Sequence, residues 1–298
     1  MKSYDQYDLW EHTDNHLTRV RFGSEPPSGY FYPSEASVVF TDAHGDSVTE
    51  GGCLRASYFR LHGGFESLPT EARTEYIFMQ GKIIEQALIE KWKEMGIWVA
   101  NNIKFVDKAN HVSGELDVIL LDPSTSKPYI AEVKTFYGYH AEKELFGNYK
   151  EKGFPKIPQL LQTLIYLNYW QDKGITQARM VYFARDSVKR RTFLIELEKE
   201  GNIVYPKVDG VVIREFAIDD IMLRYKTLKQ HIENNTVPPG DYELQYSNAK
   251  IEDYFEKGKI AKTKYEEFKK GKLKNYENIG DWQCSYCRWK NVCYSNKP

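Results

Sequence analysis

Hydrophobic and polar positions predict two strands near the middle of the chain, separated by a turn. Residues 114–122, GELDVILLD, form an apolar run rich in Val, Ile and Leu. Residues 126–136, SKPYIAEVKTF, alternate apolar and polar positions towards their end. Between the two runs, the segment DPSTSKP carries two prolines and other turn formers. We therefore predict two strands joined by a loop of several residues, which can pair as neighbours in one sheet.

Helical periodicity flanks these strands on both sides. Residues 70–96 place apolar side chains at roughly helical spacing, and residues 157–174 run from a proline-led start to a glycine stop. Further strands are predicted at 178–185 and 190–197, and residues 212–235 read as a strand end followed by an amphipathic helix. The pattern predicts an α/β (α+β) fold, a mixed sheet flanked by helices.

The same pattern suggests three segments. Residues 1–70 begin with about 50 polar, turn-rich positions and are expected to form an N-terminal arm or an extra hairpin layer. Residues 71–211 carry the core of helices and strands. Residues 212–298 form a C-terminal helical region, and no internal repeat is present.

Charged residues on the two central strands suggest chemistry at one point. Glu132 and Lys134 are two apart, so they share a strand face, and Asp117 lies on the neighbouring strand. If the strands pair, two carboxylates for a divalent cation converge beside an ammonium, which suits metal-assisted phosphodiester cleavage. The alternative is a solvated charged face.

Three polar residues on the flanking helices are further candidates. Glu85 lies among apolar neighbours on the first helix, and the alternative for it is an ion pair with Lys82, three residues earlier. Gln162 and Tyr166 are four apart and therefore share a face of the second helix. Core packing with a satisfied hydroxyl is the alternative for Tyr166.

Cysteine spacing predicts a metal site. The chain has four cysteines: Cys53 lies far upstream, and Cys284, Cys287 and Cys293 form a C-x2-C-x5-C tail. Four thiolates suit zinc or an iron–sulfur cluster, and ligand type does not separate the two. A shared site requires the tail to fold back beside the N-terminal segment. A disulfide pair or unliganded tail cysteines are the alternatives.

Composition favours a soluble enzyme. The 298 residues are 41% hydrophobic, contain no membrane-length apolar run, and begin without an apolar signal-peptide core, so we expect a cytoplasmic protein without a membrane partner. The net charge of -1 requires any DNA path to be local. The basic stretches at Lys189–Arg191 and at residues 257–280 are candidates, and ordinary solvated surface is the alternative for each.

Taken together, the motifs resemble the PD-(D/E)XK nuclease superfamily in its RecB-like branch. More narrowly, they resemble the iron–sulfur exonucleases of the CRISPR-adaptation (Cas-four) type and their phage relatives. The family order is an early cysteine, a Gly-x-x-x-His helix, a Gly-x-x-Asp strand, a Glu-x-Lys strand, a Gln-x-x-x-Tyr helix and a three-cysteine tail. The corresponding residues here are Cys53, Gly81–Glu85, Gly114–Asp117, Glu132 with Lys134, Gln162–Tyr166, and Cys284, Cys287 and Cys293.

Two positions depart from that pattern. Glu85 stands where the family usually has histidine, and its oxygen ligands suit magnesium or manganese. Leu116 precedes Asp117 where the superfamily motif has proline. The first departure affects the expected metal preference more than the expected activity.

The resemblance implies a restriction-endonuclease-like core and a metal-dependent DNA exonuclease, typically 5′-to-3′ on single strands. Asp117, Glu132 and Lys134 would be catalytic, with Mg²⁺ or Mn²⁺ held by Glu85, Asp117, Glu132 and the Val133 carbonyl. Gln162 and Tyr166 would hold DNA, and the four cysteines a structural 4Fe-4S cluster. CRISPR adaptation, phage recombination, host DNA repair and homo-oligomers are all compatible. The alternatives are a zinc-stapled DNA-binding module without catalysis, a sequence-specific endonuclease, or a structural partner with a degenerate site.

Overall fold

The computed structural model of the chain is built around a seven-stranded mixed sheet, and it describes residues 9–19, 29–148, 151–273 and 279–294. The strands lie in the order β3-β4-β5-β6-β7-β8-β9. Neighbouring strands are antiparallel except β5 and β6, which run parallel. The bounds are β3 (Trp98–Asp107), β4 (Val112–Leu121), β5 (Pro128–Phe136), β6 (Gln177–Ala184), β7 (Arg190–Glu200), β8 (Ile203–Val208) and β9 (Val211–Val212).

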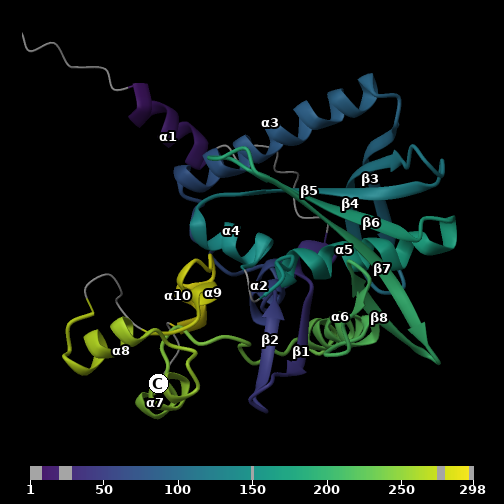
Figure 1. The fold of residues 1–298 in the computed structure, drawn as a ribbon. Coiled ribbons are helices and arrows are strands. Elements are labelled where there is room, and N and C mark those ends of the chain that lie inside the picture. Colours follow the sequence, from purple (N-terminus) through teal and green to yellow (C-terminus); the bar gives the residue numbers. More distant parts are fainter. Residues whose placement is uncertain (1–8, 20–28, 149–150, 274–278, 295–298) are drawn as a thin grey trace, which may run out of the picture.

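Helices cover the two faces of the sheet (Figure 1). Parallel strands need a long crossover, and α4 (Tyr139–Phe146) and α5 (Ile157–Trp170) supply it between β5 and β6. The α5 helix and α6 (Ile218–Glu233) pack on one face, whereas α3 (Ala72–Glu94) lies across the other. The core is accordingly divided into a large cluster on the α5 side and a small one under α3.

Segments near the N-terminal and C-terminal ends of the chain complete the large cluster. A separate hairpin of β1 (Ser37–Thr41) and β2 (Ser47–Gly51) precedes α2 (Leu54–His62), which packs on α6. The remaining elements are α1 (Leu9–Arg19), η1 (Pro33–Glu35), η2 (Gln171–Lys173), α7 (Asn248–Glu256), α8 (Lys262–Lys269), α9 (Trp282–Ser285) and α10 (Lys290–Tyr294). The large cluster reaches from Phe31 to the partly buried Cys293, so the chain's C-terminal tail packs against its core.

The expected mixed sheet with flanking helices is confirmed. The two central strands, the helices on either side of them, the two later strands and the N-terminal hairpin all form. The structure adds β3, β8 and α4, which the pattern did not predict. Parts of the N-terminal arm, 1–8 and 20–28, lie outside the described residues, and the three-segment division stays a prediction. Within the described ranges, none of the helices has the length and apolar character needed to cross a membrane.

Candidate active site at the parting of two strands

The candidate site lies where β4 and β5 stop pairing. Their ladder ends at Val118 opposite Ala131, so Asp117 and Glu132 occupy the next positions, where the strands part. Asp117 Oδ2 accepts a hydrogen bond of 2.8 Å from the Val133 backbone N–H. The sequence expectation that the two strands are neighbours is thus met, and the Asp117 carboxylate caps the backbone of the opposite strand.

Glu132 and Lys134 share the face of β5 that is turned towards α5. Lys134 Nζ lies 2.7 Å from Glu132 Oε1 and donates a hydrogen bond of 3.0 Å to Gln162 Oε1. Gln162 Nε2 in turn donates to the Tyr166 hydroxyl at 2.9 Å. A chain of contacts therefore runs from α5 to the ammonium and fixes both its position and the orientation of the Gln162 amide.

Position 114, three residues before Asp117, has no room for a side chain. A Cβ atom at Gly114 would lie 2.7 Å from Phe105, 2.9 Å from Pro33 and 3.0 Å from the ring of Tyr166. Such contacts are closer than real Cβ atoms tolerate. Gly114 thus lets Tyr166 pack against β4, and Tyr166 is only 3% exposed. This burial matches the core-packing alternative for Tyr166, and a role in holding DNA stays a prediction.

Glu85 reaches the same site from α3. Its side chain is 12% exposed and forms an ion pair of 2.8 Å with Lys82, as the simpler interpretation of the sequence anticipates. Its charge also acts on the three strand residues, since it contributes to raising the pKa of Asp117, Glu132 and Lys134. The ion pair and a place in the candidate site are therefore compatible.

Burial sets the protonation behaviour of the site. Burial, followed by the charge of Glu132, raises the pKa of Asp117 well above its usual range, although Lys134 opposes the shift. Burial also raises the pKa of Glu132 against the same opposition. Burial by itself would lower the pKa of Lys134, but the charges of Glu132 and Asp117 outweigh it and raise that pKa. The site holds an ammonium and disfavours ionised carboxylates until a further cation compensates them.

The surroundings of Glu132 fit a divalent cation. Its side chain is fully buried, and no hydrogen-bond partner among the described residues satisfies Oε2. A buried carboxylate oxygen without a partner is costly, and a hard divalent cation is the ligand that compensates it. Across the described part of the chain, no three His, Cys, Asp or Glu side chains are placed closely enough to form a ready-made cation cage. Glu85, Asp117 and Glu132 would have to close around the ion.

The four cysteines lie in one region, between α2 and the tail. Cys53 immediately precedes α2, and the tail cysteines lie on or beside α9 and α10. Arg55 Nη1 donates a hydrogen bond of 3.3 Å to Cys293 Sγ. The charge of Cys53 contributes to raising the pKa of Cys284. The tail thus folds back beside the N-terminal segment, as a shared site requires.

None of these thiols is in a disulfide. Burial raises the pKa of Cys53 and of Cys287, and raises that of Cys284 to about 11. Hydrogen bonds reach two further sulfurs, from the Trp289 N–H to Cys287 Sγ and between Cys284 Sγ and the Tyr294 hydroxyl, each at 3.4 Å. Thiols of this kind stay protonated until a metal displaces the proton.

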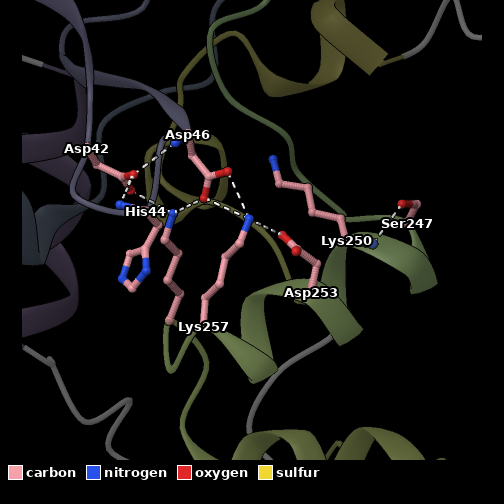
Figure 2. Close-up of polar contacts among 8 residues, drawn as sticks. Asp42, His44, Asp46, Ser247, Lys250, Asp253 and Lys257 are labelled. Carbon is pink, nitrogen blue, oxygen red and sulfur yellow. Dashed lines mark hydrogen bonds and ion pairs between the residues drawn. The ribbon is translucent and has the colours of Figure 1, made fainter.

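The two basic stretches are largely neutralised by ion pairs. Lys189 pairs with Glu142, and Arg191 pairs with Asp209 at 2.9 Å. In the second stretch, Figure 2 shows Lys257 between Asp46 and Asp253, at 2.8 and 2.9 Å. Lys259 likewise pairs with Asp42 at 2.7 Å and with Asp46. These contacts favour the solvated-surface alternative over a DNA path; positions 274–278 of the second stretch lie outside the described residues.

A family model described as the PD-(D/E)XK nuclease superfamily matches residues 60–294, and this range contains Asp117, Glu132 and Lys134. The chain belongs to the PD-(D/E)XK nuclease superfamily. Members of this superfamily are nucleases that hydrolyse phosphodiester bonds, typically with Mg²⁺ or Mn²⁺. In this PD-(D/E)XK protein, β4 and β5 bring together Asp117, Glu132 and Lys134, which the sequence analysis predicts as the acidic pair and the lysine of the motif.

Other comparisons with this PD-(D/E)XK protein add little. A solved structure described as "Crystal structure of SSO0001" is 12% identical, covers 98% of this chain and 100% of its own, and overlaps with a TM-score of 0.45. No curated protein matches the sequence.

The structure does add residues that the sequence reasoning missed: Asp241, which accepts from the Leu54 N–H at 2.7 Å, and Arg55 beside Cys293. No local sequence signal marks either contact.

Proposed function

We propose that this chain is a metal-dependent DNA exonuclease that acts on single strands or DNA ends. The observation that carries the proposal is the buried Glu132, whose Oε2 lacks a partner among the described residues, beside Asp117 and Lys134 at the parting of β4 and β5. Carboxylates whose pKa is perturbed by burial and by a specific charge partner cluster at functional sites. The superfamily supplies the reaction, phosphodiester hydrolysis.

Each residue of the site has a distinct role in the proposal. Asp117 and Glu132 hold Mg²⁺ or Mn²⁺, with Glu85 as a further oxygen ligand and the Val133 carbonyl as another. When bound, the metal supplies a water of lowered pKa and Lewis acidity towards the phosphate. Lys134 positions the attacking water and offsets the charge that develops on the phosphate.

Gln162 and Tyr166 support this lysine in the proposal. The Gln162 amide accepts from Lys134 and donates to Tyr166, so it holds the ammonium in one rotamer. Precise placement of a reacting group lowers the activation barrier because less orientational freedom is lost in the transition state. The two residues therefore act on catalysis through Lys134, in addition to the DNA-holding role that the family resemblance implies.

Exonuclease action and 5′-to-3′ polarity rest on the resemblance to the Cas-four-type exonucleases. By resemblance, the Gln-x-x-x-Tyr helix and the cysteine tail favour that group over sequence-specific endonucleases. CRISPR adaptation, phage DNA processing and recombination or repair are the settings that this resemblance favours. Partner proteins from those pathways and a homo-oligomeric state are part of the same proposal.

Linear and circular single-stranded DNA of equal length provide the decisive test. The purified chain is incubated with each substrate in Mg²⁺ or Mn²⁺, and linear DNA is labelled at either the 5′ or the 3′ end. We expect degradation of linear DNA, early release of the 5′ label as short products, and survival of the circle. Lys134→Ala should reduce the rate at least about 100-fold, the cost of removing one electrostatic donor to a developing charge.

The controls separate the alternatives. Lys91→Ala removes an exposed lysine of α3 that pairs with Glu94 and not with Glu85, and it should retain the activity. Cleavage of the circle would replace the exonuclease by an endonuclease. Wild-type rates in Lys134→Ala would remove the catalytic assignment altogether.

We further propose that the four cysteines hold a structural 4Fe-4S cluster. Four reduced thiols from the two parts of the chain match the ligand count, and hydrogen bonds to the cluster sulfurs are typical of such sites. Zinc is the alternative for the same ligands. Since Cys53 and Cys293 lie far apart in sequence, the site would close a long loop and stabilise the fold.

Anaerobic purification followed by metal analysis tests the cluster. We expect brown protein with visible iron–sulfur absorbance, and loss of that absorbance together with a lower melting temperature in Cys287→Ala. Stoichiometric zinc in colourless protein would establish the alternative. An unchanged visible spectrum in Cys287→Ala would rule out that ligand.

A further inference from the structure

A cavity of about 780 Å³ opens between the start of α3 and the cysteine tail. One wall is formed by residues 68–78, which include the first turns of α3. The opposite wall is formed by Ser285 to Arg288 and by Lys290. The volume lies within the range of binding pockets for small ligands, roughly 300–1,000 Å³. None of Glu85, Asp117, Glu132 and Lys134 lines this cavity, which shares only Cys287 with the sites described above.

The helix that forms one wall of the cavity also carries Glu85. Phe78, Lys82 and Glu85 are spaced four and three residues apart, so they follow one face of α3. Gly81 lies between them, and a Cβ atom placed there would meet only Thr135, at 3.6 Å. Seven residues of helix span about 10 Å, which is about three nucleotide steps of a stacked strand. A strand in the cavity can therefore reach the carboxylates along this face.

The lining has the composition of a surface for unpaired bases. Phe78 is 58% exposed and Tyr286 is 83% exposed, on opposite walls. Exposed rings of this kind supply faces on which bases stack. Three cations also line the cavity, namely Arg73, Arg288 and Lys290, against the two carboxylates Glu71 and Glu75. The excess of positive charge suits a phosphate backbone.

Hydrogen bonds hold the two walls at a fixed separation. Leu68 N donates to the Arg288 carbonyl at 2.8 Å, and Arg288 Nε donates back to the Leu68 carbonyl at 3.2 Å. Arg288 Nη2 also donates to Ser67 Oγ at 3.2 Å. A cavity whose walls are tied in this way is preorganised, so little ordering is required when a ligand binds.

We propose that this cavity binds two or three unpaired nucleotides of the DNA strand next to the scissile phosphate. Phe78 and Tyr286 stack on the bases, and Arg73 and Lys290 contact the backbone. The proposal deepens the proposed nuclease function, since it assigns where the single strand lies relative to Glu85. It also gives the cysteine tail a second role, because the tail forms one wall of the cavity.

Fluorescence anisotropy with a labelled single-stranded 12-mer tests this assignment. Binding is measured in a Lys134→Ala background with Mg²⁺, so that the probe stays intact. Phe78→Ala and Tyr286→Ala should each weaken binding roughly 5- to 150-fold, the range for loss of one base–aromatic contact. Binding of a blunt duplex of the same length should change less than 2-fold in either variant. Both side chains are exposed, so neither change should impair folding.

Trp98→Ala is the matched control. Trp98 is a partly exposed aromatic beyond the other end of α3, where Lys93 lies over its ring. Single-strand affinity should not change in this variant. Unchanged affinity in both Phe78→Ala and Tyr286→Ala, an equal loss in Trp98→Ala, or no binding of the single strand at all would each overturn the proposal.

The charge contribution has a test of its own. Removing one phosphate contact should reduce the slope of log affinity against log salt by about 0.7 for single-stranded DNA, so Arg73→Ala should show this reduction. Arg190→Ala, at the exposed start of β7 in the first basic stretch, is the control and should retain the slope. The reverse result would place the strand along β7 and overturn the assignment.

Failure of this proposal is distinguishable from failure of the nuclease function. Cleavage that depends on Lys134, together with unaltered affinity in the cavity variants, removes the cavity assignment alone. Conversely, absence of cleavage with the predicted losses of single-strand affinity supports the cavity and removes the catalytic proposal.

Discussion

In two clusters of carboxylates and lysines in this protein, the pKa values of the carboxylates are shifted in opposite directions. In the candidate active site, burial raises the pKa of Asp117 and Glu132. In the surface cluster at the β1–β2 turn (Figure 2), hydrogen bonds from Lys257 and Lys259 lower the pKa of Asp46 to about 2. The residue types are the same in both clusters, so their surroundings determine the sign of the shift.

Charge balance explains the difference in role. On the surface, each lysine contacts two aspartates, and these contacts join the hairpin turn to the segment after α7. In the buried site, three carboxylates face Lys134 and the half-exposed Lys82, and Glu132 Oε2 is left without a partner in the described structure. The surface cluster is balanced by its own ion pairs, whereas the buried cluster holds more carboxylates than lysines, an excess that the proposed divalent cation would compensate.

Asp117→Asn should have the largest effect of the changes that test this comparison. The amide keeps an oxygen that can accept from the Val133 N–H, but it removes the charge with which Asp117 would hold the proposed metal ion. We expect cleavage to fall at least about 100-fold in Mg²⁺. Without metal, the melting temperature at pH 8 should rise, because each unit of upward pKa shift corresponds to about 1.4 kcal/mol of destabilisation by the ionised form.

The raised pKa of Asp117 determines how the melting temperature of Asp117→Asn, relative to the wild type, changes with pH. The pKa of Asp117 is raised in the folded protein, so the protonated form favours folding and its contribution is lost as pH rises from about 4 through the raised value. The variant behaves as a permanently neutral group. The gap in melting temperature between variant and wild type should therefore widen with rising pH and close in acid, and a gap that narrows with rising pH would contradict the assigned shift.

The candidate site shows how far the sequence alone could be carried. The apolar run that follows Asp117 and the alternation around Glu132 were sufficient to predict two neighbouring strands, because strand periodicity is encoded locally. The position at which pairing stops, between Val118 and Asp117, depends on register, and no local pattern specifies it. The link from Lys134 to Gln162 likewise depends on how α5 packs on the sheet.

The C-terminal tail shows what cysteine spacing alone does not predict. Its cysteine spacing predicted a metal site, yet spacing does not reveal that Arg288 ties the tail to residues 67–68 or that Tyr286 faces α3 across a cavity. The basic stretches were candidates for a DNA path, but most of their charges are paired in the structure. Their acidic partners, including Asp46 and Asp209, are distant in sequence, so the charge matching appears only in the folded chain.

Tyr166→Phe should have an intermediate effect and separates two roles. Loss of the hydroxyl removes one hydrogen bond to Gln162, an interaction of about 1 kcal/mol, and frees the amide that holds Lys134. If Tyr166 acts through Lys134, kcat should fall roughly 5-fold with KM unchanged. If it holds DNA, KM should rise instead. Steady-state kinetics on end-labelled single-stranded DNA distinguish the two, and Tyr169→Phe on the same helix is the control.

Asp46→Asn should have the smallest effect and the opposite pH dependence to Asp117→Asn. Since the pKa of Asp46 is lowered to about 2, the stability that its charge contributes is present above about pH 4 and is lost as pH falls through about 2. The variant should therefore melt slightly below the wild type at pH 7, with the gap closing in acid and in high salt, because exposed ion pairs are screened. Cleavage should be unchanged. Scanning calorimetry of both asparagine variants from about pH 2 to about pH 8 provides the check, and parallel pH slopes in the two would mean that burial does not distinguish the clusters.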